Sequence, residues 1–157
     1  MKYFQKILNS VIAVLFFFIT QAACILYTQT DCDEKKIAES EETRRTAENN
    51  LIDARSITVN LPSGTELMAF YQGGDLLKIS TTDNLSHSEQ IFFSKGHLKV
   101  YEKSGYNNGK QYFNAWYADD GKIFCSRDML SGRFLLLDEN ECIGILKTVD
   151  EYLLAIQ

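Results

Sequence analysis

The sequence predicts an α+β fold: an antiparallel β-meander of about six strands, with an N-terminal helix and a C-terminal helix packed on one face. Two observations predict it. Three aromatic-rich segments, each centred on a Gly-containing turn, follow one another between residues 65 and 127. An apolar pattern of helical period then closes the chain over 138–157. Hairpins need a helix or a second sheet to bury their apolar faces, so the two observations belong together.

The three segments share one pattern, in which two aromatic residues precede a polar turn with Gly and an apolar-x-apolar run follows it. Their aromatic pairs fall 22 and 24 residues apart, the period of one hairpin and its connection. Gly supplies the positive φ of tight turns, and aromatic residues suit a half-buried pleated surface. Three hairpins are therefore predicted, with a candidate seventh strand at 134–137. The hairpin segments are 68–80, 90–101 and 115–125.

Strict alternation predicts that the apolar-x-apolar residues after each turn share one face of the sheet. These pairs are Leu77 with Ile79, Leu98 with Val100, and Ile123 with Cys125. The helix at 138–157 is expected to cover that face, because its apolar residues recur at helical spacing.

The segment from Asp33 to Ala54 predicts the N-terminal helix. It contains no Gly or Pro, and Glu41 stands four residues before Arg45, a spacing that pairs opposite charges on a helix. Its apolar stripe is thin, which favours a surface or stalk position over one in the core.

The N-terminus has the anatomy of an export signal. A basic start with two lysines precedes the uncharged apolar run 11–19. Three outcomes stay open: a lipoprotein cut before Cys24, a soluble protein cut after Ala22, and an uncleaved anchor over 7–27. The predicted location is the periplasm or a lipid-anchored position at the membrane, with secretion as the next option.

These boundaries divide the chain into three parts. They are a signal peptide at 1–23, a linker with the N-terminal helix at 24–56, and the hairpin domain at 57–157. The whole chain carries a formal net charge of −5, and 1–23 holds two lysines and no acid, so the remainder carries −7. This acidity argues against nucleic acid and against electrostatic capture by anionic lipid. Membrane contact is expected only through the signal or a lipid anchor.

An exported protein is expected to oxidise its cysteines. Cys125 lies in a predicted strand and Cys142 near the start of the C-terminal helix, which favours a bridge between them. Cys32 is then left over, or joins Cys24 where Cys24 carries no lipid. In the alternative, Cys125 is a small core residue without a bridge.

The hairpin pattern resembles a group of uncharacterised bacterial exported proteins and lipoproteins with tandem aromatic hairpins, written YFxxGxL. The resemblance covers about residues 65–127. It implies an envelope location and a short antiparallel meander, and it brings no activity and no catalytic residues. The third copy departs from the pattern, with an extra turn residue at Asp119-Asp120 and Cys125 where an aliphatic residue is usual.

Motifs for chemistry are scarce, and no cofactor, metal or catalytic residue is predicted. His87 and Glu89 lie between hairpins, where an imidazole beside a carboxylate could act as a general base. A single loop histidine without a second ligand or a nucleophile is more simply a solvated polar residue. A basic-aromatic patch on an exposed sheet face is the candidate binding surface. Its members are Lys99, Tyr101, Lys103 and Tyr112.

Three functions follow as hypotheses. The first is a non-enzymatic envelope protein that binds another protein, a peptide or a cell-wall component. The second is a small periplasmic hydrolase that uses His87 and Glu89. The third is an immunity-type or inhibitor protein.

Overall fold

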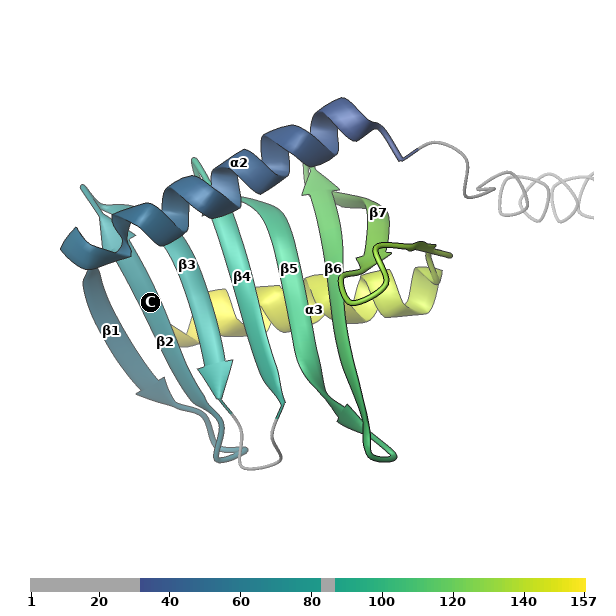
Figure 1. The fold of residues 1–157 in the computed structure, drawn as a ribbon. Coiled ribbons are helices and arrows are strands. Elements are labelled where there is room, and N and C mark those ends of the chain that lie inside the picture. Colours follow the sequence, from purple (N-terminus) through teal and green to yellow (C-terminus); the bar gives the residue numbers. More distant parts are fainter. Residues whose placement is uncertain (1–31, 83–86) are drawn as a thin grey trace, which may run out of the picture. The chain divides into compact units, whose positions relative to one another are not determined.

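The computed structural model describes residues 32–82 and 87–157, and Cys32–Gln157 forms one compact unit. The predicted signal peptide at 1–23 and the lipidation candidate Cys24 lie outside the described residues. The elements are α2 (Glu34–Asn50), the 3-10 helix η1 (Leu51–Asp53), β1 (Arg55–Asn60), β2 (Glu66–Gln72), β3 (Asp75–Thr82), β4 (Ser88–Ser94), β5 (His97–Asn107), β6 (Lys110–Asp119), β7 (Lys122–Asp128), β8 (Phe134–Leu135) and α3 (Glu139–Ala155) (Figure 1).

The described strands form a single antiparallel sheet of eight in chain order, so the predicted α+β meander is confirmed and its count of about six is low. β1 precedes the three hairpin segments, and the short β8 follows them. One further hairpin turn was not predicted from the sequence. β5 and β6 are joined by Asn108-Gly109, whose φ angles of 51° and 76° are the positive pair of a tight hairpin turn.

Each of the three predicted hairpins contains a β-bulge three residues after its turn glycine. In β2–β3, Phe70 pairs with Lys78 and Tyr71 with Leu76, which leaves Leu77 unpaired. The equivalent bulged residues in β4–β5 and β6–β7 are Lys99 and Phe124.

The bulges overturn the predicted faces. Leu98 packs on the side of the sheet that α3 covers, whereas Val100 packs on the side of α2. Ile123 and Cys125 are separated in the same way. One extra residue reverses side-chain alternation, so residues two apart across a bulge face opposite ways.

α3 covers one face of the sheet, as expected from its apolar pattern. Ile145 and Val149 are buried in a core with strand residues such as Ile91. The helix begins at the N-cap Asp138, whose carboxylate accepts a hydrogen bond from the backbone N–H of Glu141 at 2.9 Å. The position of α3 on the sheet determines where the cleft described below opens.

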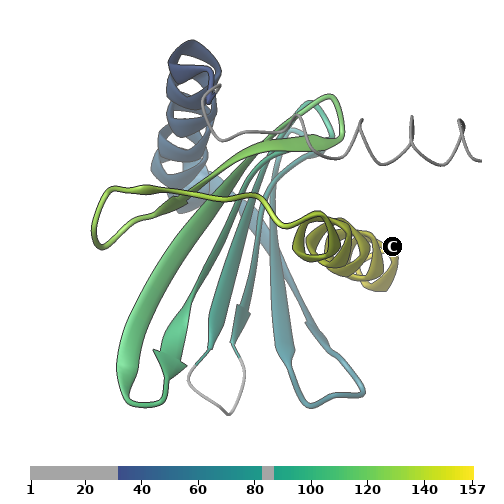
Figure 2. The same ribbon diagram turned by 90° about the vertical axis from the view of Figure 1, so that its right-hand side faces the viewer.

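α2 covers the opposite face as a surface helix, so the expected surface position is confirmed and the stalk is wrong (Figure 2). Ile37 and Ala47 are buried against strand residues that the bulges turn toward this side, among them Val100 and Tyr117. The thin apolar stripe suffices because charged residues complete the contact. The expected boundary at residue 57 falls inside β1, and α2 belongs to the same compact unit as the sheet.

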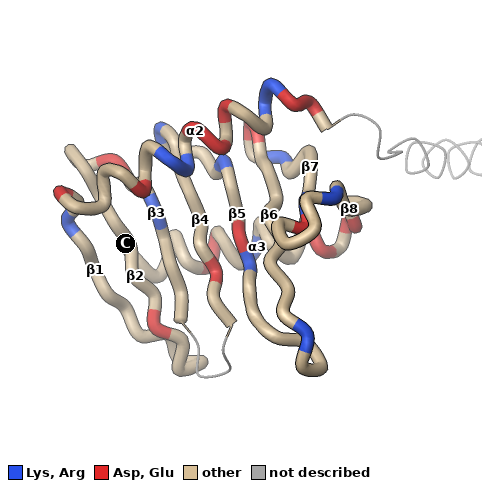
Figure 3. Tube along the Cα trace, viewed as in Figure 1, with Lys and Arg blue, Asp and Glu red and all other residues tan. Residues whose placement is uncertain are grey.

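Charged residues lie along α2 and within β3, β4 and β5 (Figure 3). Arg44 Nε lies 2.9 Å from Glu41 Oε2 and 3.7 Å from Oε1 of the buried Glu102 on β5. Tyr117 donates a hydrogen bond to Glu41 at 2.6 Å. These contacts place a carboxyl group, Glu102, in the interior beneath α2.

The disulfide joins Cys32 to Cys125, with the Cα atoms 5.3 Å apart, and Cys142 is free. The predicted Cys125–Cys142 bridge is therefore wrong. The bulge at Phe124 turns Cys125 toward α2, whereas Cys142 lies in α3 on the other face. A disulfide is consistent with an oxidising, exported location. None of the helices within the described ranges has the length and apolar character needed to cross a bilayer.

Candidate functional site

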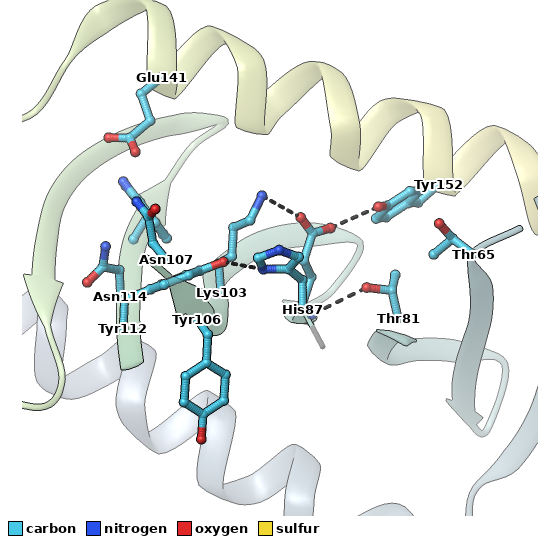
Figure 4. Close-up of a pocket in the computed structure, with 12 residues that line it drawn as sticks. Thr65, Thr81, His87, Lys103, Tyr106, Asn107, Tyr112, Asn114, Glu141 and Tyr152 are labelled. Carbon is cyan, nitrogen blue, oxygen red and sulfur yellow. Dashed lines mark hydrogen bonds and ion pairs between the residues drawn. The ribbon is translucent and has the colours of Figure 1, made fainter. Parts of the chain in front are cut away.

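A cleft of about 670 Å³ lies between α3 and the sheet face that this helix covers (Figure 4). Figure 4 shows α3 running above it, with Glu141 and Tyr152 on the helix. The strands and loops supply the rest of its lining, which is Thr65, Thr81, His87, Glu89, Lys103, Tyr106, Asn107, Tyr112, Asn114 and Trp116. The volume falls within the range of small-molecule sites, roughly 300–1,000 Å³.

Glu89 connects the helix to the sheet at this cleft. Its Oε1 lies 3.1 Å from Lys103 Nζ, and its Oε2 accepts a hydrogen bond of 2.8 Å from the Tyr152 hydroxyl of α3. Burial, together with the nearby Glu89 carboxylate, raises the pKa of Tyr101, which keeps that phenol protonated. One oxygen of Glu89 thus contacts the neighbouring strand β5, and the other holds α3 over the sheet.

His87 is positioned by a contact that depends on a glycine. Its Nδ1 lies 2.8 Å from the Tyr112 hydroxyl, and both side chains pack over Gly105 in β5. A Cβ at residue 105 would overlap His87 Nδ1 and lie 2.9 Å from the Tyr112 hydroxyl oxygen. Gly105 is therefore required by the close approach of these two side chains.

We expect Gly105→Ala to lower the free energy of unfolding by about 1–2 kcal/mol, because the added methyl forces His87 and Tyr112 apart. The matched control is Gly144→Ala in α3, where an added Cβ meets nothing within 4 Å. There Ala replaces a helix-interior Gly and should stabilise by about 0.5–1 kcal/mol. Urea denaturation of both variants measures the two changes in the free energy of unfolding. Equal stability of Gly105→Ala and the unmodified protein would contradict the described packing.

Trp116 lies at the inner wall of the cleft. Its ring packs edge-on against Tyr101, with the ring centroids 5.6 Å apart, and its side chain is 3% exposed. Within the described part of the chain, its Nε1 atom is buried and has no hydrogen-bond partner. An unpaired buried N–H is uncommon in folded proteins, because it forfeits the hydrogen bond it would make in water.

The structure separates the predicted binding patch. Lys103 and Tyr112 line the cleft, but Tyr101 is 2% exposed and is not part of an accessible surface. Lys99 lies apart from the cleft, where its Nζ contacts Asp119 Oδ1 at 2.9 Å beside Lys36 of α2. The cause is again the bulge, because Lys99 is the extra residue that breaks the alternation.

The cleft also contains residues that were not predicted from the sequence, among them Asn107, Asn114 and Glu141. Pairing of Lys103 with Asn114 in the β5–β6 register brings the asparagine beside a predicted residue. Because side chains alternate along a strand, Asn114 lies on the same face as Tyr112 and Trp116, and this alternation could have predicted its place in the cleft. Glu141 comes from α3, and only the packing of that helix shows its position.

Comparison with protein-family models, curated proteins and solved structures gave no match. Chemically, the cleft combines amide, hydroxyl, imidazole and carboxylate groups. Over residues 32–82 and 87–157, no group of three or more His, Cys, Asp or Glu side chains is arranged to hold a metal ion.

Proposed function

We propose that this protein is an exported, non-enzymatic binding protein whose ligand occupies the cleft beneath α3. The observation that carries the proposal is the engagement of Glu89, whose two oxygens contact Lys103 and Tyr152 while amide and hydroxyl groups line the space beside it. A general base must be within hydrogen-bond reach of the proton it removes. Glu89 instead stabilises the wall of a binding site.

The same proposal includes location. The Cys32–Cys125 disulfide supports export, since such bonds persist in oxidising compartments. We place the protein in the periplasm or at the membrane as a lipoprotein attached through Cys24, because the N-terminal sequence has the anatomy of an export signal. Its ligand is then a component of the envelope.

The hydrolase hypothesis remains a second candidate, because His87 and Glu89 line the same cleft. Two observations weigh against it. His87 Nδ1 is directed to the Tyr112 hydroxyl, and Glu89 is engaged as described above. The lining hydroxyls include Thr81, whose Oγ1 accepts a hydrogen bond from the Glu89 backbone N–H at 3.3 Å.

A retention experiment tests binding in the cleft. Soluble fragments from purified envelopes are passed over immobilised full-length protein, and the retained compounds are identified by mass spectrometry. Asn114→Ala should retain at least about tenfold less of the compound, since one or two hydrogen bonds are lost. Asn49→Ala is the matched control, because this asparagine is exposed on α2 and does not line the cleft. Equal retention by Asn114→Ala and the unmodified protein would contradict the proposal.

Prolonged incubation separates binding from hydrolysis. A binding protein returns the retained compound chemically unchanged. Conversion into smaller products that disappears in His87→Gln would establish the hydrolase instead.

A further inference from the structure

The outer edge of β1 is an open strand edge. Among the described strands, β1 pairs only with β2 and ends the sheet. From Ser56 to Asn60 it is uncharged, contains no Pro and is mostly β-branched. Natural proteins usually protect such an edge with a charge, a Pro, a bulge or a very short strand. The opposite edge is protected in this way, because β8 has only two residues.

The backbone groups of β1 that face outward follow from its turn with β2. The Leu61 N–H donates to the Thr65 carbonyl at 2.9 Å, and the Leu61 carbonyl accepts from the Gly64 N–H at 2.9 Å. Leu61 therefore directs both of its groups toward β2. Successive residues of a strand direct these groups to opposite sides, and the register of β1 with β2 contains no shift. The residues whose N–H and C=O groups face away from β2 are Ser56, Thr58 and Asn60.

A second copy of the chain matches these outward groups. A two-fold axis through Thr58, perpendicular to the sheet, places this residue opposite Thr58 of the second copy. The same register places Ser56 opposite Asn60 of the second copy. Every outward N–H and C=O group of β1 then has a partner, with about six backbone hydrogen bonds across the axis.

The same register also brings apolar side chains together. Ile57 pairs with Ala69, and Val59 pairs with Leu67. Ala69 and Leu67 belong to the core that α3 covers, so Ile57 and Val59 lie on that face, where both are half-buried. In the symmetric register Ile57 stands opposite Val59 of the second copy, in a pair without backbone hydrogen bonds. The Cα atoms of such pairs are about 4.5 Å apart, so the two side chains bury one another.

A hollow beside β1 favours a second copy over an unrelated peptide. It has a volume of about 440 Å³, and its lining is Arg55, Ile57, Tyr71, Gly73 and Gly74. The symmetric register places Leu61 of the second copy opposite Arg55, next to this hollow. Any extended peptide could bond to the backbone of β1. The chain's own β1 also supplies Val59 opposite Ile57 and Leu61 beside the hollow.

We propose that the protein forms a symmetric dimer in which the β1 strands of two copies pair antiparallel and join the two sheets into one. Because both copies use the same surface, the contact is closed, and the two-residue β8 offers no comparable edge for further growth. The axis is perpendicular to the sheet, so both clefts beneath α3 lie on the same face of the joined sheet.

Cross-linking of the full-length protein tests this contact at its axis. In the proposed register the two Thr58 Cα atoms are about 5.5 Å apart, within the range that a disulfide spans, about 4.4–6.8 Å. Under mild oxidation Thr58→Cys should form a dimer that reductant separates. Thr46→Cys, at an exposed threonine of α2, is the matched control and should stay monomeric. Both variants also carry Cys142→Ser, which removes the free thiol.

Two results of the cross-linking experiment would overturn the proposal. One is the absence of a Thr58→Cys dimer, or an equal yield from Thr46→Cys. The other is cross-linking of Thr58→Cys in whole envelopes to a different protein instead of to a second copy, which would show that β1 receives a foreign strand.

Sedimentation equilibrium of the full-length protein in density-matched detergent measures the association itself. The unmodified protein should approach twice the mass of one chain as its concentration rises. Thr58→Lys places like charges opposite one another at the axis and should weaken dimerisation at least about tenfold. Thr46→Lys is the control and should dimerise normally. Because Thr58 is exposed, Thr58→Lys should keep the far-UV circular dichroism of the unmodified protein. An unmodified protein that stays monomeric, or a dimer that Thr58→Lys leaves unchanged, would overturn the proposal.

Discussion

Cys32→Ser is expected to lower the free energy of unfolding by roughly 4–5 kcal/mol, the largest single effect we expect in this protein. The bridge to Cys125 closes a loop with a sequence separation of 93 residues, and the entropy that a cross-link removes from the unfolded chain grows with loop length. The bond also fixes the chain just before α2 to β7, on the face that α2 covers.

The matched control is Cys142→Ser, which removes the free, half-buried thiol of α3 and should change stability far less. Urea denaturation without reductant compares the variants. A Cys32→Ser, Cys125→Ala double variant should be about as unstable as Cys32→Ser alone, because one bond is lost in both. A large loss in Cys142→Ser with none in Cys32→Ser would contradict the described connectivity.

Glu102→Gln is expected to gain stability relative to the unmodified protein as the pH rises. Burial raises the pKa of Glu102 from its ordinary 4.5 to about 7, although the guanidinium of Arg44 opposes the rise. Between these two values the folded protein holds a proton that the unfolded chain has released. The contribution of Glu102 to the free energy of unfolding therefore falls as the pH rises from about 4.5 to about 7, and above pH 7 it falls no further.

The size of the effect follows from the shift in pKa. A difference of this size corresponds to about 3 kcal/mol, at 1.36 kcal/mol per pH unit. Other charged groups surround the carboxyl and are common to both proteins, so their titration cancels in the comparison. They are Glu41, Arg44 and Glu48 from α2 and Lys78 from β3.

Urea denaturation at pH 4.5 and pH 8 measures this difference. The advantage of Glu102→Gln should grow by about 3 kcal/mol between the two pH values. Glu42→Gln is the control, because this carboxylate is exposed on α2. The free energy of unfolding of this variant should stay within about 0.5 kcal/mol of that of the unmodified protein at both pH values. A constant difference between Glu102→Gln and the unmodified protein would show that Glu102 is not buried as described.

Turn chemistry explains how much of the fold could be predicted. Gly73-Gly74, Lys95-Gly96 and Asp120-Gly121 all have positive φ, so the hairpins were visible as dipeptides in the sequence. Asn108-Gly109 carries the same signal, but alignment of the three repeats treated it as a connection. The period of α3 was likewise visible, because its buried residues recur at helical spacing.

The bulges explain what could not be predicted. The bulged residues are Leu77, Lys99 and Phe124, which are aliphatic, basic and aromatic and share no side-chain property. Without a common residue type, the identity of the side chains does not reveal the break in alternation. The wrong disulfide and the misplaced Lys99 both follow from it.

The candidate site was predictable only in part. Lys103 and Tyr112 were found because they lie on β5 and β6 beyond the bulges, where alternation is regular. Tyr152 and Glu141 come from a helix distant in sequence, and their position over the sheet is a result of tertiary packing. Gly105 has no recognisable signal, because its role depends on two other side chains.

The indole N–H signal of Trp116 gives the most direct test of the claim that ligand binds beneath α3. The chain contains one tryptophan, so a ¹H–¹⁵N spectrum contains one such signal. Adding the compound retained from envelope fragments should shift this signal saturably, with little change at Lys99 on the α2 side of the sheet. A stationary indole signal, together with shifts confined to the residues around α2, would contradict the account.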